Sequence, residues 1–247
     1  MKRRELFGVR YNIGNMDDAV LEVLGHIKEL NGKYICFSNV HTLVTAVENE
    51  KYKKVLNSSA YTFPDGAPVA WRLRRNGNTD AGRIAGPDFM EEVFRSTADG
   101  EISHFFYGSS VQVLDKLRSA VKRRYPDIKI AGSYAPPFRK LTAEEDRRIV
   151  SLINQSGADI IWIGLGAPRQ ELFMRRHKGL LDGVMIGVGA GFDFLSGTAR
   201  RAPLWMQRLS LEWLYRLLNE PGRLAGRYLV TNTRFIWYCL KQEMARR

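Results

Sequence analysis

Short apolar runs alternate along the chain with segments whose apolar residues recur every three or four positions. The runs are rich in Ile, Val, Phe and Tyr, which is typical of strands that are buried on both faces. This alternation predicts an α/β fold, a Rossmann-like and mostly parallel sheet with helices on both faces. The predicted strands lie in KYICFS, AYT, HFFYG, DIKIAG, DIIWIGLG and VMIGVG.

Helical periodicity between these strands predicts one helix over residues 42–57, another in VQVLDKLRSAVKRRY and a third over residues 142–155. The third helix has a capping box, because Thr142 stands at the N-cap position and Glu145 follows three residues later. Helices placed between strands in this way are the connections that a parallel sheet needs.

The pattern changes after Gly197. The segment RRAPLWMQRLSLEWLYRLL predicts a long helix with Pro203 near its start, and EPGR stops it. A final amphipathic stretch, RYLVTNTRFIWYCLKQEMARR, follows. We therefore predict an α/β body of residues 1–199 and a basic amphipathic appendage of residues 200–247.

Composition narrows the class of protein. A chain of 247 residues with 45% hydrophobic residues can bury a substantial core. The two cysteines, Cys36 and Cys239, lie far apart and lack the spacing of a zinc site or a disulfide framework, which favours a reducing cytosol. No run of about 18 apolar residues and no signal-peptide pattern occurs, so we expect a cytoplasmic protein that does not span a membrane.

The chain carries a formal net charge of +12, from 38 Lys and Arg against 26 Asp and Glu. Residues 200–247 hold ten of these bases and only three acids, so the excess is mainly a C-terminal feature. Such a surplus indicates an anionic partner, whether nucleic acid, anionic lipid or a phosphorylated small molecule. A solvated basic face is the simpler explanation of the same residues.

Four polar or glycine-rich segments each follow a predicted strand: FSNVHT, FPDG, GLGAPRQE and GVGAGFDF. Ligands of open α/β sheets bind beyond the carboxyl ends of the strands, so these four loops are expected to face one cleft. Asp65 in FPDG has an ordinary structural explanation as a turn or cap residue. Asn39 and Arg83 would supply a polar group and a fixed cation for an anionic substrate beside it.

The other two loops are rich in glycine. Gly164 and Gly166 allow close backbone approach to a ligand at a helix start, although a tight strand-to-helix turn explains them equally. Gln170 can donate to and accept from a sugar or base, and Glu171 also suits the first turn of a helix. Asp193 is either a cap or a hydroxyl acceptor. A dinucleotide fingerprint, a Walker A motif, a G-x-S-x-G elbow and a cluster of metal ligands are all missing from the sequence.

Read together, the loops resemble the WecB/TagA/CpsF glycosyltransferase family of bacterial polymer synthesis. The resemblance rests on FSNVHT, FPDG, RIAGPDF, FFYGSS, YPDIKIAGSYAPPF, IWIGLGAPRQE, IGVGAGFDFLSGTARRAP and LEWLYRLLNEPGRLAGRY, and covers nearly the whole chain. The order of the PDG, GAPRQE and RRAP…LEWLYRL…EP blocks is far more specific than any one glycine loop.

The resemblance implies an inverting transferase that needs neither metal nor cofactor. It would move a sugar from a UDP-sugar to a polyprenyl-diphosphate-linked saccharide, with glucose, glucuronic acid or N-acetylmannosamine in the donor. Carried over from the family, the catalytic residue falls on Asp65. The substrate-binding residues fall on Asn39, Arg83, Gln170 and Asp193.

The resemblance also concerns the appendage and the donor. We expect Arg216, Arg223 and Arg227 to converge on a diphosphate, and the apolar and basic residues near the C-terminus to associate peripherally with an anionic membrane surface at its inner face. Family members that use N-acetylmannosamine often have Thr two residues before the asparagine. This chain has Phe37 there, a departure that counts against that donor.

Two readings of other classes stay open. One is a nucleic-acid-binding protein that uses the basic C-terminal region, although no helix-turn-helix, RRM or KH signature supports it. The other is a protein that binds a nucleotide sugar without catalysis. The sequence is silent on the oligomeric state, so a homo-oligomer is not decided.

Overall fold

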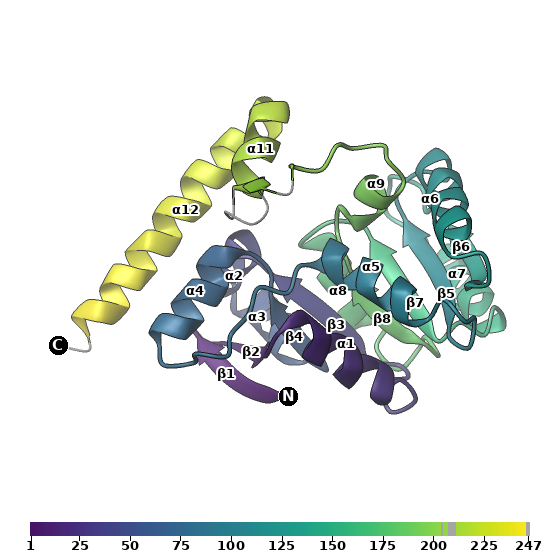
Figure 1. Ribbon diagram of the computed structural model, residues 1–247, viewed down its shortest axis with the longest axis horizontal. Helices are drawn as coiled ribbons and strands as arrows, with labels where there is room; N and C mark the ends of the chain where they lie inside the picture. The colour runs from purple at the N-terminus through teal and green to yellow at the C-terminus, as the bar shows by residue number, and fades with distance from the viewer. Residues whose placement is uncertain (204, 207–210, 246–247) are drawn as a thin grey trace.

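A computed structural model describes residues 1–203, 205–206 and 211–245, with the side chains of Arg216, Arg223 and Arg227 outside that description. Its centre is a six-stranded sheet in the order β4-β3-β8-β7-β5-β6, and every neighbouring pair is parallel (Figure 1). The strands are β3 (Tyr34–Ser38), β4 (Tyr61–Pro64), β5 (Ser103–Gly108), β6 (Lys129–Tyr134), β7 (Ile160–Gly164) and β8 (Val184–Gly187). All six predicted strands and the α/β fold are thereby confirmed.

Alternate residues of the central strands enter two different cores. In β3, for example, Tyr34 and Cys36 belong to one buried cluster, whereas Ile35 and Phe37 belong to the other. This is the period-two pattern of a strand that is covered on both faces. Helices therefore pack on both sides of the sheet, as predicted.

The first core is closed by α2 (Val40–Glu48), α3 (Glu50–Asn57), α4 (Ala67–Arg75), α7 (Ala143–Gln155) and α8 (Arg169–Arg176). The second is closed by α1 (Met16–Gly25), α5 (Gly86–Ser96), α6 (Val111–Arg124) and α9 (Gly191–Leu195). The single helix predicted over residues 42–57 is wrong, because the chain breaks at Asn49. The backbone of Asn49 is extended, and its side chain accepts from the Tyr52 N–H (3.1 Å) to cap α3.

An N-terminal hairpin that the sequence analysis does not predict joins β1 (Lys2–Leu6) to β2 (Val9–Ile13). Its turn consists of Phe7 and Gly8, both with positive φ (50° and 82°), which matches the right-handed twist of the two strands. Four exposed residues precede Leu6 in β1, so this strand has no apolar run to reveal it.

The C-terminal segment contains α11 (Glu212–Asn219) and α12 (Pro221–Met244), and α12 packs along α2 (Figure 1). Phe235 of α12 is buried in the first core, where its ring meets that of Phe7 at 6.2 Å between centroids. The single helix predicted over residues 200–218 is wrong at residues 200–203 and at Leu211, which are not helical, whereas residues 205–206 and 212–218 are helical as predicted. Residues 204 and 207–210 of that prediction lie outside the described part of the chain.

A buried arginine also joins α4 to α12. Arg72 donates to Gln242 Oε1 (2.8 Å), to Glu243 Oε1 (2.6 Å) and to the carbonyl oxygen of Cys239 (3.2 Å). Its side chain is only 1% exposed. Because a buried guanidinium is costly without partners, this set of bonds fixes the end of α12 on the helix that follows Asp65.

Candidate functional site

Four neighbouring strands, β4, β3, β8 and β7, carry the four loops that the sequence singles out. These strands are adjacent and parallel, so their carboxyl ends lie along the same edge of the sheet. The loops that follow Ser38, Pro64, Gly164 and Gly187 therefore begin side by side, although they are up to about 150 residues apart in the sequence.

Asp65 lies directly against the loop that carries Asn39. Its backbone N–H donates to the carbonyl oxygen of Ser38 (3.0 Å), the residue before Asn39. Gly66 has a φ of 105°, a conformation that L residues rarely adopt, and a methyl group on it would lie 3.9 Å from Asn39 Cβ. The Pro-Asp-Gly turn thus presents a half-buried carboxylate beside the start of α2.

Asn39 is the N-cap of α2. Its Oδ1 atom accepts from the Thr42 N–H (3.2 Å), and the preceding Ser38 is fixed by the hydroxyls of Tyr11 (2.8 Å) and Thr42 (3.0 Å). With its oxygen used as a cap, Asn39 has its NH₂ group to offer a ligand. The two predicted residues Asn39 and Asp65 are thus brought together.

Arg83 lies close to the same turn, because the N–H of Ile84 donates to the carbonyl oxygen of Pro64 (2.9 Å). Its guanidinium is bound to two carboxylates, Asp88 Oδ2 through Nη1 and Glu212 Oε2 through Nη2, each at 3.0 Å. Arg201 contacts the same two carboxylates, at 2.5 Å to Asp88 Oδ1 and 3.5 Å to Glu212 Oε1.

These four residues form what we call the charge ring: Arg83, Asp88, Arg201 and Glu212. Its side chains are between 18% and 27% exposed, so the ring borders solvent. Burial alone would lower the pKa of Arg201, but Asp88 and Glu212 raise it above its ordinary value. The sequence analysis assigns Arg83 and misses the other three, which lie in the quoted blocks RIAGPDF, RRAP and LEWLYRL.

The loop after β7 contains Gly164, Gly166, Gln170 and Glu171. A methyl group on Gly164 would lie 2.6 Å from the Phe192 ring, so this glycine makes room for α9. Gly166 has a φ of 73°, and its carbonyl oxygen accepts from the Gln170 N–H at the start of α8 (3.0 Å). These contacts explain both glycines within the fold, and their role toward a ligand stays a prediction.

Gln170 and Glu171 are buried, at 4% and 0% exposure. The Gln170 side chain accepts from the N–H of Gly189 (3.0 Å) and donates to Glu171 Oε1 (2.7 Å), while Tyr52 donates to Glu171 Oε2 (3.1 Å). Burial raises the pKa of the Glu171 carboxyl, against the lowering effect of these hydrogen bonds. In this structure the pair fixes the loop after β8, and a role in substrate binding stays a prediction.

Asp193 lies in the first turn of α9. Its carbonyl oxygen accepts from the Ala199 N–H (3.0 Å), which turns the chain back after the helix. The predicted diphosphate ligands Arg216, Arg223 and Arg227 have side chains outside the described residues.

Several helices at this edge start without a side-chain cap. At this edge, α4, α5, α8 and α9 have no cap hydrogen bond from their N-cap residues, which are Gly66, Ala85, Pro168 and Ala190. In the C-terminal segment, α12 also starts without one, at Glu220. In contrast, α1, α3, α6 and α7 are capped by Asn15, Asn49, Ser110 and Thr142. An uncapped start leaves backbone N–H groups that an anion can accept from.

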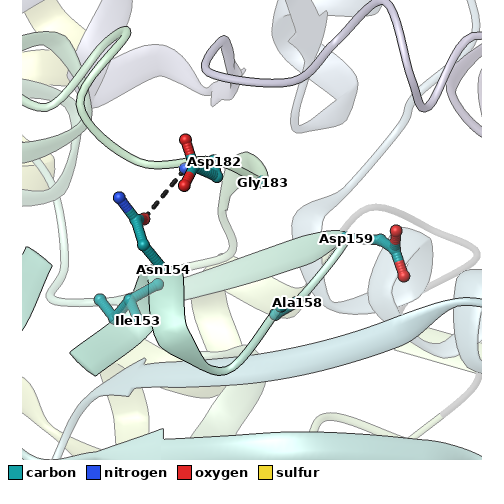
Figure 2. A pocket seen from close by; sticks show the side chains of 7 residues that line it. Ile153, Asn154, Ala158, Asp159, Asp182 and Gly183 are labelled. Atoms are coloured by element: carbon teal, nitrogen blue, oxygen red, sulfur yellow. Dashed lines mark hydrogen bonds between the residues drawn. The ribbon is translucent and has the colours of Figure 1, made fainter. Parts of the chain in front are cut away.

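The opposite edge of the sheet holds a cavity of about 130 Å³. Its lining includes Asn154, Asp159 and Asp182, and Figure 2 shows Asn154 accepting from the N–H of Asp182 (3.1 Å). Asp159 and Asp182 precede β7 and β8, which places the cavity far from the loops described above. Two carboxylates and no cation in this lining make it unsuited to a phosphate.

Metal ligands do not cluster in the described part of the chain, where no group of three or more His, Cys, Asp and Glu residues could hold an ion. In addition, none of the described helices has the length and apolar character needed to cross a membrane.

A profile of the glycosyl transferase WecG/TagA/CpsF family matches residues 4–247. An N-acetylglucosaminyldiphosphoundecaprenol N-acetyl-beta-D-mannosaminyltransferase of Bacillus spizizenii is 32% identical, over 89% of this chain and 83% of the relative. A protein of the same name from Bacillus subtilis is 33% identical, over 90% of this chain and 86% of the relative.

Proposed function

The chain belongs to the WecG/TagA/CpsF family of glycosyl transferases, and from this premise we propose that it transfers a sugar from a UDP-sugar to a polyprenyl-diphosphate-linked saccharide. The reaction inverts the anomeric centre and serves the synthesis of a bacterial cell-surface polysaccharide. The names of its relatives, which state an N-acetylmannosaminyl group and a lipid diphosphate acceptor, support this class of reaction.

The observation that carries the proposal is the position of Asp65 among uncapped helix starts at the carboxyl edge of the sheet. Inversion requires the acceptor hydroxyl to attack the anomeric carbon from the side opposite the departing UDP. Asp65 takes the hydroxyl proton as the new C–O bond forms, and the bond to the diphosphate oxygen breaks with its electrons leaving on UDP. The Asn39 amide next to it is suited to orient a sugar hydroxyl.

The leaving diphosphate has to be stabilised by the protein's own groups. Backbone N–H groups at the starts of α4 and α5 and the guanidinium of Arg83 are the donors at this edge, whereas the Gln170 N–H of α8 is already bound to the carbonyl oxygen of Gly166. In the described part of the chain, the groups that can donate hydrogen bonds to the diphosphate are thus backbone amides and arginines. No group of three or more His, Cys, Asp and Glu residues that could hold an ion lies among the described residues.

For the donor, the relatives make UDP-N-acetylmannosamine the first candidate, with UDP-glucose and UDP-glucuronic acid as alternatives. Phe37 is the departure that counts against N-acetylmannosamine. In this structure Phe37 is buried against the rings of Phe63 (5.7 Å) and Phe89 (5.3 Å) and belongs to the core. A change at this position therefore alters packing beneath the loop, and the donor has to be identified by assay.

The test of the proposal is a transfer assay with these three UDP-sugars and a short-chain lipid diphosphate N-acetylglucosamine acceptor. We expect one donor to give a new glycosidic product whose anomeric configuration is opposite to that of the donor. Product with retained configuration would overturn the inverting mechanism. Salt-dependent RNA binding without transfer from any donor would favour the nucleic-acid-binding alternative.

We also propose that α12 attaches the protein peripherally to the cytoplasmic face of an anionic membrane. Leu224 and Phe235 face the body and are buried, whereas apolar residues on the outer side are 50–73% exposed. These outer residues are Leu229, Ile236, Trp237 and Leu240. Arg234 and Lys241 flank them, which is the arrangement of an interfacial helix.

This attachment is tested with vesicles that contain anionic lipid. The variant Trp237→Glu places a charge on the outer face of α12 and is expected to weaken sedimentation with vesicles. Leu21→Glu is the matched control, because Leu21 is equally apolar and 72% exposed but lies on α1. Equal loss of vesicle binding in both variants would contradict a role specific to α12.

A further inference from the structure

The charge ring connects the body to the C-terminal segment. Arg83 precedes α5, Asp88 lies in its first turn, Arg201 follows α9, and Glu212 is the first residue of α11 (Figure 1). Three members are thus close to the sheet edge that carries Asp65, and the fourth comes from the C-terminal helices. Without Glu212 the cluster has one net positive charge.

The two guanidinium groups converge on the Glu212 carboxylate from different sides. Arg83 approaches Oε2 at 3.0 Å, and Arg201 approaches Oε1 at 3.5 Å. Two arginines that each reach a different oxygen of one anion are also the arrangement that binds a phosphate group. The 3.5 Å contact of Glu212 is longer than either contact of Asp88 (3.0 and 2.5 Å), so Glu212 is the less tightly bound of the two acids.

We propose that Arg201 is a second diphosphate-binding residue beside Arg83, and that Glu212 occupies this pair of arginines until the diphosphate of the donor replaces it. This inference rests on the proposed function, because it assumes a nucleoside diphosphate at this edge. Asp88 keeps both arginines in place throughout. Replacement releases the ion-pair contact between α11 and the body, so the position of α11 depends on whether the donor is bound.

The exchange is energetically reasonable. Ion pairs that border solvent contribute little net stability, because water and salt screen them. A diphosphate offers more acceptor oxygens and more charge than a single carboxylate, so it competes well for two guanidinium groups. The Glu212 carboxylate lowers the affinity for the donor because it competes for the two arginines. In the absence of donor, it keeps the guanidinium groups of Arg83 and Arg201 from facing each other without an anion between them.

The first experiment measures UDP binding by calorimetry in the full-length protein. Glu212→Gln removes the competing charge and is expected to tighten UDP binding about fivefold, the scale of one partly exposed ion pair. Arg201→Ala is expected to weaken it about tenfold or more, as for a charge-assisted hydrogen bond. In the double variant, the gain from Glu212→Gln should shrink, because one of the two arginines for which Glu212 competes is gone.

Matched controls lie on α7. Glu144 and Arg148 form an exposed ion pair there, so Glu144→Gln and Arg148→Ala repeat the same charge changes away from the sheet edge. Neither is expected to change the affinity for UDP. If Arg201→Ala fails to fold, Arg201→Lys replaces it, because lysine keeps the charge but lacks the planar guanidinium group that can bind two oxygens. The affinity for UDP is then expected to fall several-fold.

The second experiment follows hydrogen exchange of the backbone amides of α11. Addition of UDP to the wild-type protein is expected to speed exchange in residues 212–219, and Glu212→Gln should show the faster exchange without UDP. Unchanged affinity in Glu212→Gln together with unchanged exchange upon UDP binding would overturn this inference alone. A wild-type protein that binds no UDP would overturn the proposed function, and this inference with it.

Discussion

The two halves of the sheet's carboxyl edge begin their helices differently. After β5 and β6, the helices α6 and α7 start with side-chain caps, where Ser110 accepts from Val113 N–H (3.3 Å) and Thr142 from Glu145 N–H (3.2 Å). Beside β4, β8 and β7, four helices start at residues without a side-chain cap. In that half α2 does have a side-chain cap, Asn39, which is itself a predicted site residue.

The difference shows where the chain gives up local stability. A side-chain cap contributes about 1 kcal/mol to a helix, so four uncapped starts in one half of one edge are a substantial omission. The same N–H groups are those that a diphosphate needs in a site that uses arginines and amides. We infer that the capped half serves the fold and the uncapped half serves the ligand.

The largest expected effect concerns the acid in the uncapped half. Asp65→Asn keeps the size of the side chain but cannot accept the proton, so we expect turnover to fall about 100-fold or more with UDP binding within about twofold. Asp115→Asn is the control, because Asp115 is an exposed acid on α6 in the capped half. Steady-state transfer and UDP calorimetry measure both effects. Normal turnover in Asp65→Asn would remove the base from the mechanism.

The second effect concerns a buried histidine in the capped half. His104 on β5 accepts from Trp162 Nε1 (3.1 Å) and meets the Thr97 hydroxyl (2.9 Å), and burial lowers its pKa to about 4. The unfolded chain binds a proton below about pH 6.5, whereas the folded protein does so only near pH 4. The contribution of His104 to the free energy of unfolding is therefore fully present above pH 6.5. It is lost as the pH falls, and the loss amounts to about 2 kcal/mol at pH 5.

Urea unfolding at pH 7.5 and pH 5 measures this loss. In His104→Gln, the difference in unfolding free energy between the two pH values should be smaller than in the wild-type protein. An equal difference in both proteins would mean that other groups cause the pH dependence.

Much of the fold could be predicted from the sequence, because strands buried on both faces leave continuous apolar runs. The hairpin of β1 and β2 could not, since the residues of β1 before Leu6 are polar and exposed. The break at Asn49 was hidden because a cap residue can also stand inside a helical pattern. The segment after Arg200 was predicted as helix from periodicity, but Arg201 holds it by tertiary ion pairs.

The site divides in the same way. The carboxyl ends of parallel strands lie at one edge of a sheet, so the four loops start side by side. Asp65 and Asn39 could therefore be predicted as neighbours. The pairing of Arg83 with Glu212 could not, because the two residues are 129 positions apart and an ordinary acidic residue carries no local signal. The hydrogen-bond partner of the buried Glu171 likewise could not be predicted, because Tyr52 comes from another helix.

The third effect tests a cap in the capped half. Thr142→Ala removes the acceptor for Glu145 N–H and one side of the capping box on α7. We expect the free energy of unfolding to fall by about 1 kcal/mol, with turnover unchanged. Urea unfolding and the transfer assay measure the two outcomes. A fall in turnover without a fall in stability would contradict the division between the two halves.

The smallest effect comes from adding a cap where the structure has none. Ala85 precedes α5 with φ −93° and ψ 140°, the extended geometry of an N-cap residue, yet its methyl group cannot accept from the N–H of Asp88. Ala85→Ser supplies that acceptor, and because the site is buried we expect a gain of about 0.5 kcal/mol in the free energy of unfolding.

The same substitution should weaken UDP binding about twofold, because the new hydroxyl takes an N–H group that the diphosphate would use. Ser110→Ala is the reciprocal control in the capped half, where stability should fall and UDP binding should not change. A gain in stability without any loss of UDP affinity would mean that the start of α5 does not face the ligand. The uncapped start that matters would then be that of α4, and the ligand would lie nearer to Asp65 than to the charge ring.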